Sequence, residues 1–158
     1  MAYKIITPQA GYQPIAATET TQNHALGTIV VAQDPTYGVG EFIYLAGVAS
    51  TAVGDVVRVA AGFTTVRGVA SGRGKIAVAM SANVASQYGW YQISGEAVVN
   101  AAATVAASTP AYLTATAGSV DDAVVSGDKI DGFVFSAART GAGTVTAILT
   151  QPCANGNG

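Results

Sequence analysis

Short runs rich in Val, Ile, Thr and Tyr follow one another along this chain, and turn signals separate them. The separation is roughly 8–12 residues, which is typical of β-sandwiches and β-barrels. Glycine accepts positive φ, and a neighbouring carboxylate can bond backbone N–H groups. Three turn signals are Gly-acid pairs of this kind: Gly54-Asp55, Gly95-Glu96 and Gly127-Asp128. The pattern predicts an all-β fold, either a jelly roll or a small β-barrel or sandwich.

Helical periodicity is scarce in the sequence. Residues 101–107 (AAATVAA) fit a short helix and a tight loop of small residues equally well. Residues 48–57 loosely resemble residues 116–130, but the similarity is too weak to indicate a repeat architecture. We expect ten strands, at residues 28–33, 41–47, 55–60, 64–69, 75–80, 89–94, 96–99, 111–116, 130–138 and 143–149.

The chain divides into three parts by composition. Residues 1–25 are polar and interrupted by Pro, which predicts an extended N-terminal arm in which residues 3–6 could pair as a short edge strand. Residues 26–150 form one β-rich domain, a size that can bury a core. Residues 151–158 (QPCANGNG) predict a flexible C-terminal tail.

Charged residues make up only 10% of the chain, against about 25% in ordinary soluble domains. The mean hydropathy is +0.39, but no stretch resembles the roughly 20 apolar residues of a spanning helix. We therefore expect no membrane partner, and burial of much surface against other chains. The net charge is −2 and the basic residues are scattered, which argues against nucleic-acid binding.

The sequence offers little chemistry. His24 is the only histidine and Cys153 the only cysteine, so His-based triads and multi-histidine metal sites are excluded. The single cysteine and the absence of an apolar leader suit synthesis in a reducing cytosol. We expect no enzymatic activity and no cofactor. The densest acidic group fits solvated turn acids better than a cation site: Asp121, Asp122, Asp128 and Asp131.

Three segments resemble a known family. They are GEFIYLAGVASTAVGDVV (40–57), VAMSANVASQYGWYQISGEAVV (78–99) and AYLTATAGSVDDAVVSGDKIDG (111–132). Together they resemble the small head decoration, or cement, proteins of tailed bacteriophages. The resemblance implies a β-rich homodimer or homotrimer that is made in the host bacterial cytoplasm. It also implies binding to the outer surface of the expanded capsid, where the protein bridges major capsid protein subunits, with no catalytic residues.

The only tryptophan lies in an aromatic cluster with Tyr88 and Tyr91. Side chains alternate along a strand, so we expect Trp90 in the core and Tyr91 on the opposite, outward face. Tyr88 and Tyr91 are then the predicted contacts with a subunit or the capsid, since Tyr is enriched at interfaces. A ligand pocket is the alternative for this cluster.

The predicted arm carries four apolar residues: Tyr3, Ile5, Ile6 and Tyr12. We expect them to order on a neighbouring subunit or on the shell; a disordered terminus is the alternative.

Two other functions of the protein stay open. One is another virion component, such as a head fibre base or a tail protein. The other is a carbohydrate-binding adhesive β module, for which Trp90 and its tyrosines would be the platform.

Overall fold

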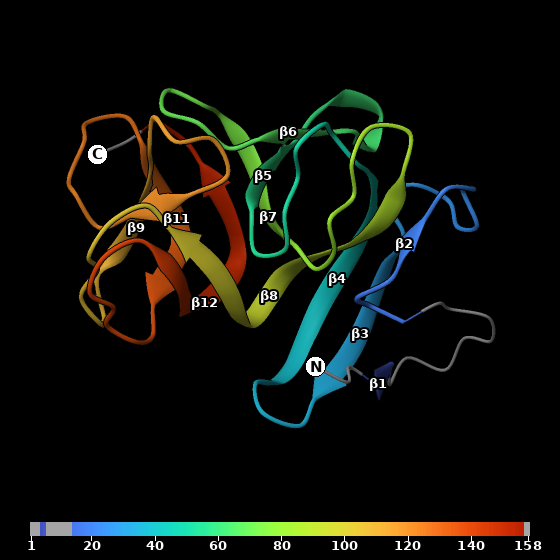
Figure 1. Cartoon of the computed structure of the whole chain (residues 1–158), viewed down its shortest axis with the longest axis horizontal. Coiled ribbons are helices and arrows are strands. Elements are labelled where there is room, and N and C mark those ends of the chain that lie inside the picture. Colours follow the sequence, from blue (N-terminus) through green and yellow to red (C-terminus); the bar gives the residue numbers. More distant parts are fainter. Residues whose placement is uncertain (1–3, 6–13, 157–158) are drawn as a thin grey trace.

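The computed structural model describes residues 4–5 and 14–156, and strands dominate it (Figure 1). This confirms the all-β prediction. One short 3-10 turn, η1, spans Ala61–Phe63. The segment 101–107 contains no helix: Ala101 is the last residue of a strand, and a loop follows it. The strands are β1 (Lys4–Ile5), β2 (Thr18–Glu19), β3 (Ile29–Asp34), β4 (Gly38–Ala46), β5 (Val56–Val59), β6 (Thr65–Arg67), β7 (Gly74–Ala79), β8 (Tyr88–Ala101), β9 (Pro110–Leu113), β10 (Val120–Asp121), β11 (Lys129–Phe135) and β12 (Gly143–Ala154).

The sheet closes into two small barrels that share β8. Barrel 1 contains β4, the first half of β8, β7, β5 and β6, in that order, and a parallel bridge between Ala46 and Thr64 closes it. Barrel 2 contains the second half of β8, β12, β11, β9 and β10, and parallel pairing of Val120 with Ala101 closes it. Barrel 2 is the yellow-to-red part of Figure 1. The predicted barrel form therefore describes the fold better than the jelly roll.

The two barrels repeat the same strand order, which the weak sequence similarity did not reveal. In each barrel, the last strand passes through a residue of positive φ and then continues out of that barrel. This residue is Gly95 in β8 (φ 92°) and Gln151 in β12 (φ 46°). The sequence predicted separate strands before and after Gly95. Strand β8 instead runs through this residue, and this is how one strand serves both barrels.

Three hydrophobic clusters hold the molecule together. One fills barrel 1 and includes Leu45 and Tyr91. The largest fills barrel 2 and includes Phe133 and Phe135. The third lies on the outer face of β4 and β8, where Ile15, Val30, Ala32 and Met80 pack with Phe42, Tyr44 and Trp90. Apolar burial of this extent is the main favourable term in folding.

The predicted arm and tail are both shorter than expected. Ile15 is 1% exposed, and β2 pairs with β8, so the chain from residue 14 belongs to the folded body. Strand β12 continues to Ala154 and pairs with β7 and β11, so the predicted flexible tail over 151–158 is wrong for residues 151–154. Pro152 within it is buried.

One turn recurs before the strands. Its third residue has positive φ, and the fourth residue donates its N–H to the carbonyl of the first, as at Gly54 and Gly127. Asp55 also accepts the N–H of Ala52, as the Gly-acid signal predicted. Asp128 is only 5% exposed and accepts the N–H of Ser71, so the prediction of a solvated acid is wrong there. Four serines take the glycine position with φ 64°: Ser50, Ser71, Ser86 and Ser108.

Candidate functional site

The aromatic stretch of β8 is buried on both faces. Trp90 lies in the outer cluster, as the core prediction required, but Tyr91 is also 0% exposed because its side chain fills barrel 1. The prediction that Tyr91 contacts a partner is therefore wrong. Its neighbour Tyr88 is half-buried at the edge of the outer cluster, and its contact role stays a prediction.

The hydroxyl of Tyr91 lies at a buried polar spot. Burial raises the pKa of this phenol, while the nearby side chains of Thr65 and Asn83 act in the opposite direction. Neither side chain completes a hydrogen bond of good geometry with the hydroxyl. Asn83 is itself 0% exposed and lies directly over Gly89, where a Cβ would clash with its amide. The close packing of Asn83 on Gly89 places the 81–87 loop directly against β8.

A ring cluster surrounds Trp90 on the outer face. His24 lies edge-on to Tyr44 with ring centroids 5.0 Å apart, and the Tyr44 and Trp90 centroids are 5.1 Å apart. The Tyr44 hydroxyl donates to the Glu19 carboxylate. Burial, and then this hydrogen bond, raise the pKa of Tyr44 above its ordinary value. The cluster fixes residues 14–28 to the barrel and leaves no open aromatic platform around Trp90.

Part of the predicted arm is placed by backbone pairing. Strand β1 runs antiparallel to β3, with Lys4 opposite Gln33 and Ile5 opposite Ala32. Addition of a strand to an exposed edge is a recurrent mode of peptide recognition. Of the predicted arm contacts, Tyr3, Ile6 and Tyr12 lie outside the described residues.

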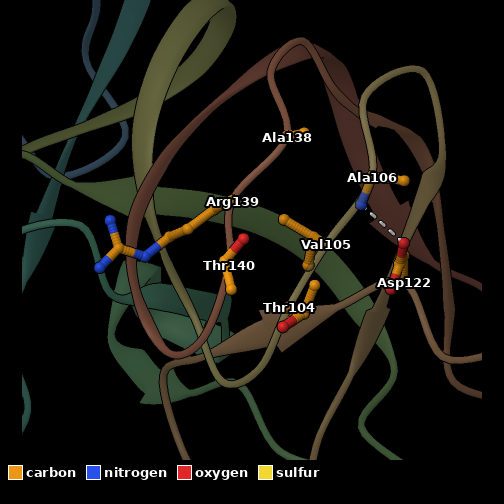
Figure 2. A pocket seen from close by; sticks show the side chains of 7 residues that line it. All are labelled: Thr104, Val105, Ala106, Asp122, Ala138, Arg139 and Thr140. Carbon is orange, nitrogen blue, oxygen red and sulfur yellow. Dashed lines mark hydrogen bonds between the residues drawn. The ribbon is translucent and has the colours of Figure 1, made fainter.

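A shallow depression of about 440 Å³ opens at one end of barrel 2 (Figure 2). Asp122 lines it, but its carboxylate accepts the N–H of Ala106 at 2.9 Å. The guanidinium of Arg139 points away from the other lining side chains in Figure 2 and donates to the carbonyls of Ala142 and Thr144. The Asp122 carboxylate and the Arg139 guanidinium are therefore both engaged in hydrogen bonds that hold loops, and the other polar side chains that line the depression are those of Thr104 and Thr140.

The four clustered acids do not converge in space. Asp121 accepts the N–H of Ala123, and burial, followed by the charge of Asp122, raises the pKa of Asp121. Asp131 bonds the side chain of Asn155 and pairs with Lys129 at 3.6 Å. Within residues 4–5 and 14–156, no three His, Cys, Asp or Glu side chains are grouped so as to hold a metal ion.

The surface instead offers exposed apolar side chains on rigid strands. Ile29 is 52% exposed beside an apolar groove of about 170 Å³ at the end of barrel 1, which Ile43, Val59 and Ile93 also line. Val134 and Ile148 are 40% and 50% exposed on the outer face of barrel 2. The sequence analysis missed these residues, because alternation places Val134 and Ile148 on the face opposite buried Phe133 and Leu149 but does not show whether that face is covered.

Comparison with known proteins gives no further assignment: no protein-family model matches the chain, and neither does a curated protein or a solved structure. The described part of the chain contains no helix of the length and apolar character needed to cross a membrane.

Proposed function

We propose that this protein is a non-enzymatic structural protein of a phage virion, which binds the outer surface of the expanded capsid and bridges major capsid protein subunits. The observation that carries the proposal is the resemblance of residues 40–57, 78–99 and 111–132 to the head decoration proteins of tailed bacteriophages. These segments contain most of β4 and its following loop, the end of β7 with most of β8, and the chain from β9 into the start of β11. They therefore include strands of both barrels, but none of β6 or β12.

The surface chemistry supports a binding role. Only 10% of the residues are charged, and several large apolar side chains remain exposed on strands. Exposed apolar patches of this kind commonly mark protein contacts. The two charged side chains that line the depression of barrel 2, Asp122 and Arg139, are both engaged in hydrogen bonds that hold loops.

Two parts of the molecule are the proposed contacts with the shell. The first is the N-terminal segment, whose strand β1 already pairs with the edge of β3. The second is the apolar groove beside Ile29. An arm that pairs with a sheet edge can exchange one partner edge for another at small enthalpic cost, because backbone hydrogen bonds are alike.

Co-sedimentation with undecorated, expanded phage shells tests the proposal. We expect saturable binding at a fixed ratio to capsid subunits, and weaker binding after deletion of residues 1–12. A folded chain that does not bind shells would overturn the capsid role and favour another virion component, such as a head fibre base or tail protein.

The carbohydrate-binding alternative is less well supported. An adhesive module would present an exposed aromatic platform or acid-rich binding loops, and two rings of the expected platform, Trp90 and Tyr91, are both 0% exposed. A glycan array with the full chain separates this alternative from the virion role.

A further inference from the structure

A cross-strand row of three side chains forms the contact between the two barrels. Val56 on β5, Val78 on β7 and Gln92 on β8 are neighbours in register on the outer face of barrel 1. All three are at most 1% exposed. Val56 and Val78 belong to the hydrophobic cluster of barrel 2, and Gln92 donates to carbonyls at the point where β8 enters that barrel. Barrel 1 therefore packs on barrel 2 through this row.

Barrel 2 carries the matching row at the same positions of its own strands. Pro110 on β9 lies opposite Val134 on β11, which lies opposite Ile148 on β12. Phe133, Phe135 and Leu149 point inward, so this row points outward. Unlike the buried row of barrel 1, it is exposed, with Val134 at 40% and Ile148 at 50%. All three residues of the barrel 2 row are apolar, because Ile148 occupies the position that Gln92 has in the barrel 1 row.

The surroundings of this row are suited to burial. Glu96 lies opposite Ile148 on β8, and its carboxylate accepts a hydrogen bond from the Ser136 hydroxyl at 2.7 Å. The outward positions beside it on β8 and β12 are uncharged, and include Val98 and Thr146. The charged side chain that lies beside Ile148 therefore already has a hydrogen-bond partner.

We propose that the row of Pro110, Val134 and Ile148 is the contact between copies of this chain, and that its occupant is the same face of a second copy. Within the chain, the equivalent row of barrel 1 is buried against the hydrophobic cluster of barrel 2, so this is a row position at which the fold already buries apolar side chains between barrels. Two copies of this row can meet about a two-fold axis without leaving the adjacent Glu96 charge unpaired, because its carboxylate already accepts a hydrogen bond from Ser136. The proposed function includes self-association of the chain, and this proposal names the surface that mediates it. The role of this contact in a virion rests on the proposed function.

Sedimentation velocity of the full chain over a range of concentrations tests this contact without shells. We expect the native chain to self-associate. Ile148→Glu should raise the dissociation constant at least about tenfold, because it places a charge in the centre of an apolar contact. The matched control is Val66→Glu, which introduces the same charge at an exposed β-branched residue of barrel 1 (Val66 is 39% exposed) and should self-associate like the native chain.

A second variant, Ile148→Thr, keeps a β-branched residue on the strand and should weaken self-association while thermal unfolding stays close to that of the native chain. A native chain that is monomeric at every concentration would overturn the contact, as would unchanged self-association in both Ile148 variants. A native chain that self-associates but does not bind expanded shells would overturn the capsid role. The contact would still be supported if both Ile148 variants weakened self-association.

Discussion

Trp90 and Tyr91 are consecutive residues of β8, yet their side chains are buried in two different hydrophobic clusters. Alternation along the strand sends Tyr91 into barrel 1 and Trp90 to the outer face. That outer face is covered because Ile15, Val30 and Ala32 pack over it. The first half of β8 is thus an interior strand on both sides, which explains why a chain with few aromatics concentrates them here.

The Tyr91 hydroxyl has no hydrogen-bond partner of good geometry, so most of the contribution of Tyr91 comes from its ring. We expect Tyr91→Phe to change the free energy of unfolding by less than about 1 kcal/mol. Tyr91→Ala should lower it by about 3–5 kcal/mol, because a cavity opens in barrel 1. Urea unfolding of both variants checks this. A loss of about 2 kcal/mol or more in the phenylalanine variant would show that the hydroxyl is bonded after all.

The sequence predicted the long strands well because their alternation and their glycine turns are local signals. It failed where the outcome depends on distant partners. Gly95 has the signature of a turn, but β8 continues through it because β12 pairs with β8 from Ser94 to Ala101. Residues 151–154 have the composition of a tail, and they become a strand only because β7 and β11 supply their hydrogen-bond partners.

The site predictions failed for a related reason. Alternation shows that Trp90 and Tyr91 point to opposite faces, but only the tertiary structure shows that both faces are covered. The exposed row of barrel 2 was missed because Val134 and Ile148 have the composition of core residues. Their exposure follows from the number of layers around the strand, which no local pattern reports.

Alkaline pH should destabilise the protein through two buried phenols. The pKa values of Tyr44 and Tyr91 are raised above 10.0, in both cases chiefly by burial. The folded chain therefore holds protons that the unfolded chain releases. This stabilisation is complete below about pH 10 and is lost as the pH rises, by about 1.4 kcal/mol per pH unit for each group.

Unfolding in urea between pH 9 and pH 11 measures this slope. Tyr44→Phe removes one of the two groups and should reduce the slope accordingly. In absorbance titration, tyrosinate from Tyr44 should appear only as the chain unfolds. A slope in the Tyr44→Phe variant that equals the native slope would contradict the assignment.

The serine turns store backbone strain that glycine would relieve. Ser86 holds φ 64°, a left-handed conformation that costs a side-chain-bearing residue about 1–2 kcal/mol. Ser86→Gly removes this cost, although glycine adds entropy to the unfolded chain, so we expect a net gain of roughly 0.5 kcal/mol. Ala85→Gly, one residue earlier and outside the left-handed region, should instead lower stability by a similar amount. Thermal unfolding compares the two, and equal effects would exclude the strain.

Gly118 has the same position in another turn of this type, and here the substitution adds a side chain instead of removing one. It holds φ 85°, and a Cβ there would lie 2.6 Å from the Asp55 carboxyl carbon. Gly118→Ala should therefore cost more than about 1 kcal/mol, through both backbone strain and this clash. The comparison variant is Gly141→Ala, which has φ 74° but nothing within 4 Å of the added Cβ, so it carries the strain alone. Thermal unfolding should show the larger loss in the Gly118 variant; equal losses would mean that Asp55 moves aside freely.

Asp55 joins three parts of the fold around one buried carboxylate. It accepts the N–H of Ala52 in its own turn, the Nε–H of Arg67 on β6 at 2.9 Å, and the side-chain amide of Asn100 on β8 at 2.9 Å. The carboxylate is buried while the Arg67 side chain is 28% exposed. Removal of the arginine would therefore leave a buried negative charge without its countercharge.

We expect Arg67→Ala to lower the free energy of unfolding by about 3 kcal/mol for this reason. The matched control is Lys129→Ala, which breaks the longer Lys129–Asp131 pair between two well-exposed side chains and should cost less than about 1 kcal/mol. Urea unfolding of the two variants under the same conditions makes the comparison. If the two losses were equal, hydrogen bonds from Ala52 and Asn100 alone would be enough to hold the Asp55 charge, and the Arg67 pair would contribute no more than a surface ion pair does.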